Sequence, residues 1–500
     1  MITFNNIPTT QRTPGVYLEV DNSKALKGLL PNPHRVLIIG QKEATGTASA
    51  LTLQQITRDG LAEGYFAPGA NLTRMVNAFR RGNPNTEMWA IAVSEAAAAT
   101  RASGILSVVG SATTNGTIYL MIGGVQVKTP VTSGWSAVDI CSAVKSDVNA
   151  NTNLCVRMSG STGTMSTLTL STRLFLYAVG SGEFGNYLDV RTNFYEGQTN
   201  PAGVTYVLST LAGGTNNPTI ADVWAVIDGE QYHHVVHPYT DATNLAAVEG
   251  ELNTRYSPQV DLQGYAYTAA KGTFASCAAV GLSRNSPFQT IAGAYDSPTP
   301  PEEWAAAWAA QCSYNLNNDP ARPVHYLTLA GVIPPSAKSA SRFTRAERDL
   351  LLYDGIATWL VDANGNAVIE RSITTYRTNA AGIADPSYLD IETMFTILEI
   401  RYQYKSRMVT RFILPRFKLA DDSTPIAPGA KIARPKDVRS ESIAVFTLLR
   451  DAGLIENLDD FITNIVVERD AVDVNRVNVL LPPDLVNQFR ILAGTLQFIL

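Results

Sequence analysis

The stretch RVLIIG, residues 35–40, is a continuous apolar run that ends in a glycine. A run without polar alternation is typical of a strand buried on both faces of a sheet. Residues 71–81 follow with apolar side chains at helical spacing, and residues 88–94, MWAIAVS, form a second apolar run. Strand, helix and strand in this order predict α/β architecture with a largely parallel sheet.

The same alternation returns after residue 218. Polar residues suited to capping precede helical patterns at Thr219, Thr299 and Thr344, and each predicts the start of a helix. Apolar segments at 233–239 and 324–332 predict strands between these helices. The parallel sheet is therefore expected to continue through this part of the chain.

Residues 99–215 differ from their surroundings because they are rich in Thr, Ser, Gly and Val. The segment 116–131 alternates in polarity on both sides of Gly123-Gly124, which indicates a hairpin. A helix is expected over 136–148, after a capping box. We predict that 99–215 is a mainly β insertion.

The last third changes pattern again. Alternation on either side of Asn364-Gly365 predicts a second hairpin. After residue 386 we expect one long helix to 408 and another over 437–452. Strands are expected at 461–470, 476–483 and 488–500.

Both ends of the chain carry strand-like segments without a local partner. RTPGVYLEV, residues 12–20, alternates after a Pro-Gly turn, and the final LQFIL, residues 496–500, alternates and then stops. Terminal residues usually fray, and an exposed apolar strand is an aggregation hazard. Each segment is therefore expected to be paired, either within its own domain or with the sheet of another subunit.

These patterns predict an α/β multi-domain chain. The expected parts are an α/β middle domain (22–98 plus 216–385), a mainly β insertion domain (99–215) and, from residue 386, a part that combines helices and strands.

Composition narrows the class of protein. Of 500 residues, 45% are hydrophobic and 17% are charged, against roughly 25% charged in typical soluble domains. A weakly charged surface fits a protein covered by partners, and a net charge of −5 argues against general nucleic-acid binding. The four cysteines are far apart, as in a reduced cytosolic protein. The chain begins without the features of a signal peptide, and no apolar run is long enough to predict a membrane span.

Few motifs suggest catalysis. Gly180 to Gly185 match the pattern GxGxxG, but the following residues alternate like a strand, so a glycine-rich turn is favoured over a cofactor loop. The sequence contains neither GxSxG nor a GK dipeptide, which argues against a nucleophile elbow and a Walker A loop. Nothing in the sequence favours a triad assembled from distant residues.

His233, His234 and His237 are three of only five histidines. Metal ligands must converge from one face, and on a strand His234 would point away from the other two. We favour a strand that reaches the sheet edge over a metal site.

A basic segment at 401–418 contains no acidic residue. Its cations are Arg401, Lys405, Arg407, Arg411, Arg416 and Lys418. A solvated face with helix C-terminal cations is one interpretation, and a docking patch for an acidic protein is another. Nucleic-acid binding through the interleaved aromatic residues is a third.

Several longer stretches carry a family resemblance. They are VYLEVDNSKA (16–25), RVLIIGQ (35–41), SPTPPEEWAAA (297–307), DPARP (319–323), GVIPPS (331–336), RFTRAERDLLLYDGI (342–356), ERSITTYRTNAAGIADPSYLD (370–390) and NVLLPPDLVNQFRILAGTLQFIL (478–500). In these stretches the sequence resembles the Mu-like contractile phage tail sheath proteins. The resemblance spans essentially the whole chain and is least evident in the insertion.

The resemblance implies a structural protein without catalytic, metal or cofactor sites. It implies a middle domain of subtilisin-like topology, an insertion that projects outward, and an α+β inner C-terminal domain (386–485) that faces the tail tube. It also implies an N-terminal arm (1–21) and a C-terminal arm (486–500). The cations that it makes candidates for facing the tube are Arg401, Lys405, Arg407 and Arg411.

The resemblance also implies that both arms join subunits by β-strand addition. The candidate N-terminal residues are Gly15, Val16, Tyr17, Leu18, Glu19 and Val20. The candidate C-terminal residues are Ile491, Leu496, Gln497, Phe498, Ile499 and Leu500.

The implied partners are other copies of the chain in stacked hexameric rings, the tail tube protein, and the baseplate and tail terminator proteins. Contraction of such a sheath would drive the tube through the host envelope. The implied location is the virion tail, assembled in the host cytoplasm, without nucleic-acid binding or membrane insertion. The alternatives are another structural protein of a virion or tail-like particle, and an α/β hydrolase-type enzyme.

Overall fold

The computed structural model describes residues 12–16, 18, 28–160, 173–336, 342–427 and 429–499. The chain divides into two compact units. The large unit comprises Pro33–Leu398 and Asn487–Leu500, and the small unit comprises Met1–Asn32 and Glu399–Val486. We describe each unit separately.

A six-stranded sheet in the order β13-β12-β11-β1-β3-β2 forms the centre of the large unit. Five of its strands run parallel, while β2 pairs antiparallel with β3 at one edge. The strands are β1 (Arg35–Gln41), β2 (Leu53–Gln55), β3 (Glu87–Val93), β11 (His234–Val236), β12 (Tyr265–Lys271) and β13 (Gln289–Tyr295). Residues 36–41 of β1 are buried, which explains the apolar run and confirms the predicted strand.

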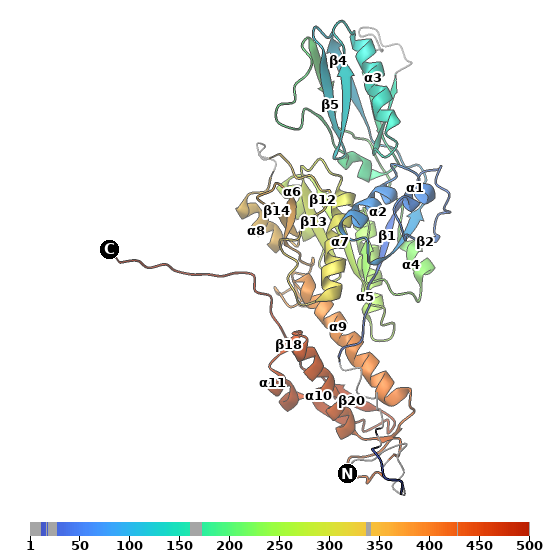
Figure 1. Ribbon diagram of the computed structural model, residues 1–500, viewed down its shortest axis with the longest axis vertical. Helices are drawn as coiled ribbons and strands as arrows, with labels where there is room; N and C mark the ends of the chain where they lie inside the picture. The colour runs from blue at the N-terminus through green and yellow to red at the C-terminus, as the bar shows by residue number, and fades with distance from the viewer. Residues whose placement is uncertain are drawn as a thin grey trace. The chain divides into compact units, whose positions relative to one another are not determined.

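Helices pack around this sheet (Figure 1). They are α1 (Leu61–Phe66), α2 (Asn71–Gly82), α4 (Ala221–Ile227), α5 (Ala242–Tyr256), α6 (Phe274–Leu282), α7 (Pro301–Asn318) and α8 (Arg345–Tyr353). Helix α7 is the most buried of these and contacts α2, β12 and β13. Its Trp304 and Trp308 are almost fully buried, and their indole N–H groups donate to Ser297 and Ser372. Two large side chains are therefore buried with their polar atoms satisfied.

The segment between β3 and α4 forms two antiparallel sheets and a helix around a core of their own. One sheet has the order β10-β4-β8-β7 and the other the order β6-β5-β9. The elements are β4 (Ser103–Gly110), β5 (Gly116–Ile122), β6 (Val125–Val131), α3 (Ala137–Ala150), β7 (Val156–Gly160), β8 (Arg173–Ala178), a 3-10 turn (Glu183–Tyr187), β9 (Val190–Thr192) and β10 (Val204–Leu208). We call residues 99–215 the insertion.

The two ends of the insertion lie together. Thr100 and Thr215 form an antiparallel bridge, their hydroxyl oxygens are 2.7 Å apart, and Asn216 donates to the Ala98 carbonyl. The chain therefore leaves and re-enters the α/β part at one place.

The predicted hairpin at Asn364-Gly365 is confirmed, with β14 (Thr358–Val361) antiparallel to β15 (Ala367–Arg371). The strand predicted at 324–332 is wrong. That segment lies beside β15, with a single bridge between Thr328 and Val368 and a few backbone hydrogen bonds, but Tyr326 has a left-handed φ of 59° that interrupts extended backbone.

The small unit combines helices with short two-stranded sheets, and the boundary between the units falls within α9. Its elements are α9 (Ile391–Met408), a π-helical turn (Val409–Ile413), β16 (Lys418–Leu419), β17 (Ile432–Ala433), α10 (Pro435–Asp451), β18 (Ile455–Glu456), α11 (Leu458–Asn464), β19 (Val466–Arg469), β20 (Val477–Leu480) and β21 (Asp484–Leu485). Phe446 of α10 stacks on Phe461 of α11 with ring centroids 4.1 Å apart. The strand predicted over 461–470 is therefore partly wrong, because Phe461–Asn464 are helical and β19 begins only at Val466.

A buried ion cluster connects α2 with the first turn of α7. The guanidinium of Arg74 lies 2.5 Å from the Glu302 carboxylate and 3.1 Å from that of Glu303. All three side chains are buried. Removal of one member of a buried pair leaves the other as an uncompensated charge in a poorly solvated place.

We expect Arg74→Ala to lower the free energy of unfolding by roughly 3–5 kcal/mol, since the buried Glu302 would lose its cation and Glu303 would keep only Arg81 at 3.5 Å. Arg80→Ala on the same helix is the control, because Arg80 pairs with the exposed Asp59, and it should cost less than about 1 kcal/mol. Denaturant titration of both variants measures the difference. Equal losses would contradict a special role for the buried cluster.

Candidate functional site

The carboxyl ends of the parallel strands, where open α/β sheets usually bind ligands, carry contacts to the insertion. Lys271 ends β12, and its ammonium donates to the Tyr187 carbonyl at 2.9 Å. Arg191 of β9 pairs with Asp189 of the insertion and with Asp296, which follows β13. Burial lowers the pKa of Lys271. The insertion therefore covers part of the edge at which an α/β enzyme would hold its substrate.

The hairpin of the insertion is seated against the start of α7. The predicted turn is confirmed, because Gly123 and Gly124 join β5 to β6 with φ of 53° and 81°. A Cβ atom on Gly123 would lie 2.4 Å from the Cys155 sulfur, and one on Gly124 would lie 3.0 Å from the Thr299 hydroxyl. Only glycine fits both the conformation and the space.

The glycine motif from Gly180 to Gly185 leads into a short 3-10 turn and then β9, so a long helix N-terminus that could bind phosphate does not follow it. Instead, backbone N–H groups of the motif donate hydrogen bonds to side chains of the same chain that lie outside the insertion. The Ser181 N–H donates to Glu95 at 3.0 Å, and the Glu183 N–H donates to Asn217 at 2.8 Å. This segment is a seam between the insertion and the α/β part.

The histidines form a buried aromatic cluster. His34 Nδ1 lies 3.0 Å from His234 Nε2, and His234 Nδ1 lies 3.0 Å from the Tyr267 hydroxyl. His34 also stacks on His233, and Phe395 stacks on His234. In the described part of the chain, no group of three or more His, Cys, Asp or Glu side chains is arranged to hold a metal ion. The predicted edge position is wrong, because β11 lies between β12 and β1 inside the sheet.

Burial lowers the pKa of each histidine in or near β11. For His233 and His237 the pKa falls to about 4, because the charged imidazolium would be desolvated. The pKa values of His34 and His234 also fall well below the usual range, through burial first and through neighbouring histidines second. These side chains are neutral in the folded chain at neutral pH.

This cluster predicts a loss of stability in acid. A histidine with a lowered pKa in the folded state gives its full stability above the unfolded pKa of about 6.5, and this stability falls as pH drops toward 4, where the unfolded chain binds more protons. In His233→Gln, the drop in unfolding free energy between pH 7 and pH 5 should be smaller than in the native chain by roughly 2 kcal/mol.

Chemical denaturation at the two pH values measures this difference. His325→Gln is the control, because His325 is mostly solvated and should contribute less. The same pH dependence in His233→Gln and the native chain would contradict the interpretation.

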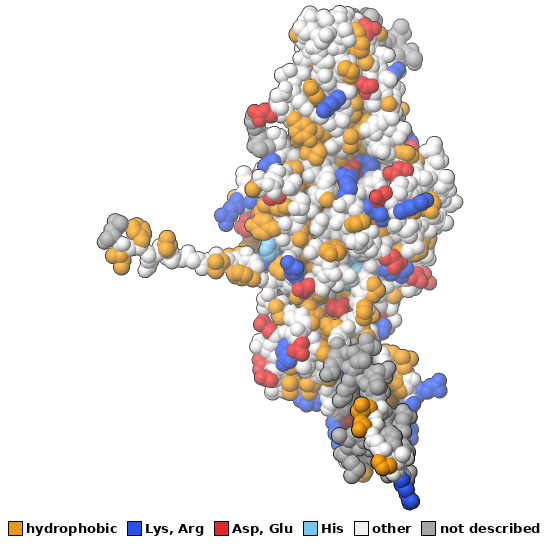
Figure 2. Space-filling view, viewed as in Figure 1, with side chains coloured by type: hydrophobic (Ala, Val, Ile, Leu, Met, Phe, Trp, Pro, Cys, Tyr) orange, Lys and Arg blue, Asp and Glu red, His pale blue; other side chains and the backbone are white. Residues whose placement is uncertain are grey.

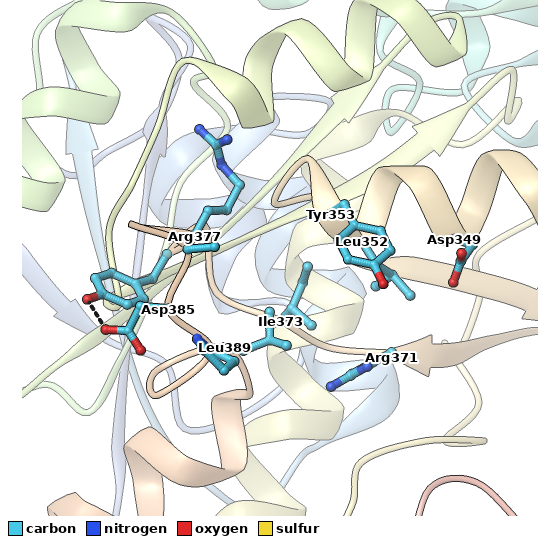
Figure 3. Close-up of a pocket in the computed structure, with 11 residues that line it drawn as sticks. Asp349, Leu352, Tyr353, Arg371, Ile373, Arg377, Asp385 and Leu389 are labelled. Atoms are coloured by element: carbon cyan, nitrogen blue, oxygen red, sulfur yellow. Dashed lines mark hydrogen bonds between the residues drawn. The ribbon is translucent and has the colours of Figure 1, made fainter. Parts of the chain in front are cut away.

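A cavity of about 260 Å³ lies beside α8 in the large unit (Figure 3). Around it, Tyr376 donates to Asp385 at 2.7 Å and Arg371 forms two 3.0 Å contacts with Asp390. The residues that line it are Asp349, Leu352, Tyr353, Arg371, Ile373, Tyr376, Arg377, Ala384, Asp385, Pro386 and Leu389. This set contains no serine, cysteine, lysine or histidine that could act as a nucleophile beside a base.

The basic segment is partly neutralised within the small unit. Arg407 forms an ion pair with Glu441 of α10, and Arg411 lies 3.6 Å from the same carboxylate. Arg401 and Lys405 lie on α9. The segment includes a π-helical turn whose last residue, Ile413, is exposed together with the following Leu414, a feature that the charge pattern did not reveal.

The small unit also offers short sheets to a partner. β18 pairs only with β21, and β19 only with β20, among the strands of the described residues. Two-stranded sheets have little stability alone and leave backbone groups at their edges unpaired. Val466 and Leu480, opposite each other in the β19–β20 pair, are exposed apolar side chains. These edges are suited to an added strand.

The candidate arm residues are exposed wherever the structure describes them. Val16 and Leu18 are 90% and 89% exposed, while Tyr17, Glu19 and Val20 lie outside the described residues. At the other end Ile491, Leu496, Gln497, Phe498 and Ile499 are exposed and Leu500 lies outside. The C-terminal segment forms an extended trace without secondary structure and carries a row of apolar side chains (Figures 1 and 2). Within residues 488–499 the predicted strand is not formed by this chain alone.

None of the described helices is both long enough and apolar enough to cross a membrane.

Comparison with known proteins identifies the class of protein to which this chain belongs. The phage tail sheath protein central domain matches residues 213–375, and the phage tail sheath C-terminal domain matches residues 384–499. A full-length relative is 37% identical over 499 residues. The chain belongs to the phage tail sheath family, whose members are structural proteins of contractile tails and not enzymes.

That relative is the Mu-like prophage FluMu tail sheath protein of Haemophilus influenzae (strain ATCC 51907 / DSM 11121 / KW20 / Rd), and the similarity covers 100% of both chains. The predicted resemblance to Mu-like sheath proteins is therefore confirmed.

Solved structures are also similar. A sheath tail protein from Desulfitobacterium hafniense is 12% identical with a TM-score of 0.45, over 94% of this chain and 100% of that one. A sheath tail protein from Listeria innocua is 12% identical with a TM-score of 0.47, over 92% and 94%. The sheath complex of an extracellular contractile injection system in the contracted state is 10% identical with a TM-score of 0.47, over 98% of both chains.

Proposed function

We propose that this sheath subunit polymerises through its terminal arms, which add strands to the sheets of neighbouring copies. The observation that carries this proposal is the exposed, extended and apolar C-terminal segment at 491–499. Burial of a large apolar side chain contributes about 1.5–3 kcal/mol, and each ladder hydrogen bond adds about 0.5–1.5 kcal/mol. One arm can thus contribute several kcal/mol once it is paired.

The receiving sheet would be in the small unit, where β18–β21 and β19–β20 have open edges. An extended chain rises about 3.3 Å per residue, so residues 491–499 can span about 30 Å. This reach is enough to leave one subunit and pair with the next.

Stacked hexameric rings around a tail tube are the assembly that we propose for these contacts, with baseplate and tail terminator proteins at the ends and assembly in the host cytoplasm. The small unit would face the tube, through the end of α9 with Arg401, Lys405, Arg407 and Arg411. The middle domain would have subtilisin-like topology, and the insertion would face outward. The five-part layout from 1–21 to 486–500 belongs to this proposal.

Contraction would then drive the tube through the host envelope. The free energy for this step would come from surface buried between subunits in the contracted state, because the edge of the sheet that could hold a nucleotide is occupied by contacts such as Lys271 to Tyr187. The arms would keep the subunits joined while the rings rearrange.

Paired aspartates in the arm tip test the proposal. Leu496→Asp with Phe498→Asp changes two residues on one side of an extended segment, and we expect loss of sheath polymers in electron micrographs with an unchanged unfolding temperature. Gln497→Asp, on the other side, is the matched control and should polymerise. Polymers of normal length and number from the double variant would refute arm-mediated assembly.

Excision of the insertion tests the layout. Because Thr100 and Thr215 are bridged, a short linker in place of residues 99–215 should close the chain without strain. We expect a folded protein that still polymerises, since neither arm is touched. A soluble, folded excision variant that forms no polymer would show that the insertion is part of the subunit contact.

A further inference from the structure

The C-terminal arm has an unusual distribution of charge and burial around Arg490. This residue is the only charged side chain between 487 and 500. Its side chain is 15% exposed, whereas the neighbouring Phe489 and Ile491 are 75% and 81% exposed. The one residue that water would solvate best is largely covered by protein, and the apolar residues beside it are in water.

The Arg490 side chain packs against two carboxylates of its own large unit. Its guanidinium lies 2.8 Å from Glu392 and 3.2 Å from Asp390. Glu392, in the first turn of α9, has no exposed surface, and its other carboxylate oxygen accepts the Val324 N–H at 3.0 Å. Arg490 is the cation that compensates this buried charge.

The contact belongs to a larger, balanced network. Asp390 also accepts two hydrogen bonds from Arg371, so two arginines alternate with two carboxylates. Burial raises the pKa of Glu392, and the charge of Arg490 acts against this rise. Removal of Arg490 would leave a net negative charge beside the buried end of α9.

We infer that Arg490 is a positioning residue that anchors the root of the C-terminal arm to its own subunit and leaves residues 491–500 for a neighbour. When Arg490 is held in place, residues 491–500 can adopt fewer conformations before they pair. They therefore lose less conformational entropy on pairing. The anchor itself is a property of one subunit. Its effect on assembly rests on the proposed function of the arms.

Trypsin can measure the anchor directly. The bond after Arg490 is the only one in 487–500 that trypsin should cut, and cleavage would release the peptide ILAGTLQFIL. Cleavage needs the arginine side chain to enter the protease, so the ion network should slow it. The experiment uses the full chain at concentrations where light scattering shows monomers, and mass spectrometry follows the peptide.

We expect Asp390→Asn with Glu392→Gln to release the peptide at least tenfold faster than the native chain. Arg371→Gln is the matched control, because it alters the same network without touching Arg490, and its rate should stay within about threefold of the native rate. Arg490→Lys keeps a trypsin site and the charge but loses the planar fork, and it should be cut several-fold faster. The Arg490→Lys variant also tests the anchor if the double variant does not fold. Native release as fast as in Arg490→Lys would overturn the anchor.

The positioning effect has a separate readout. The subunit concentration needed for polymers should rise several-fold in Asp390→Asn with Glu392→Gln and to a similar extent in Arg490→Gln, because both changes remove the anchor. An unchanged threshold despite faster cleavage would overturn the positioning role. Truncation after Arg490 should abolish polymers, and polymers from that truncation would refute the arm function while the cleavage result on the anchor stands.

Discussion

The constraint on which this molecule depends is an apolar extended segment that pairs with no strand among the residues that the structure describes. Residues 491–499 keep their large side chains in water and form no strand within the described chain. A soluble protein tolerates such a segment only if it is short, or if a partner regularly covers it. The folded units must therefore be stable without it. In the large unit the deeply buried α7 provides much of the core packing, and the Arg74 cluster joins its first turn to α2.

The large unit also shows how an enzyme-like sheet can serve a structural purpose. Its parallel strands would ordinarily present a ligand cleft at their carboxyl ends. Lys271, Arg191 and the glycine turn at Gly180–Gly185 instead bind the insertion to that edge. The buried histidines, which resemble a catalytic or metal-binding set in the sequence, contact one another and aromatic rings. Features that suggest chemistry thus hold parts of one unit together.

Sequence patterns predicted the elements whose causes are local. Burial on both faces makes β1 a continuous apolar run, and turn chemistry places the hairpins at Gly123-Gly124 and Asn364-Gly365. Sequence patterns did not predict contacts between residues that lie far apart in the chain. His34 meets His234 from 200 residues away, and Arg490 meets Glu392 from 98 residues away, so no window of sequence contains either pair. The apolar segment at 324–332 buries Leu329 and Val332 without forming a strand, because hydrophobicity predicts burial better than backbone geometry.

The meeting of Thr100 with Thr215 has a consequence for how such chains diversify. Because the first and last residues of the insertion are neighbours, the α/β part needs only one pair of adjacent positions to accommodate it. The insertion is in this sense a cassette. Recombination at that point could replace the whole cassette with a different domain, or delete it, while the host sheet keeps its register. The same junction is the natural place at which to graft an unrelated domain for display.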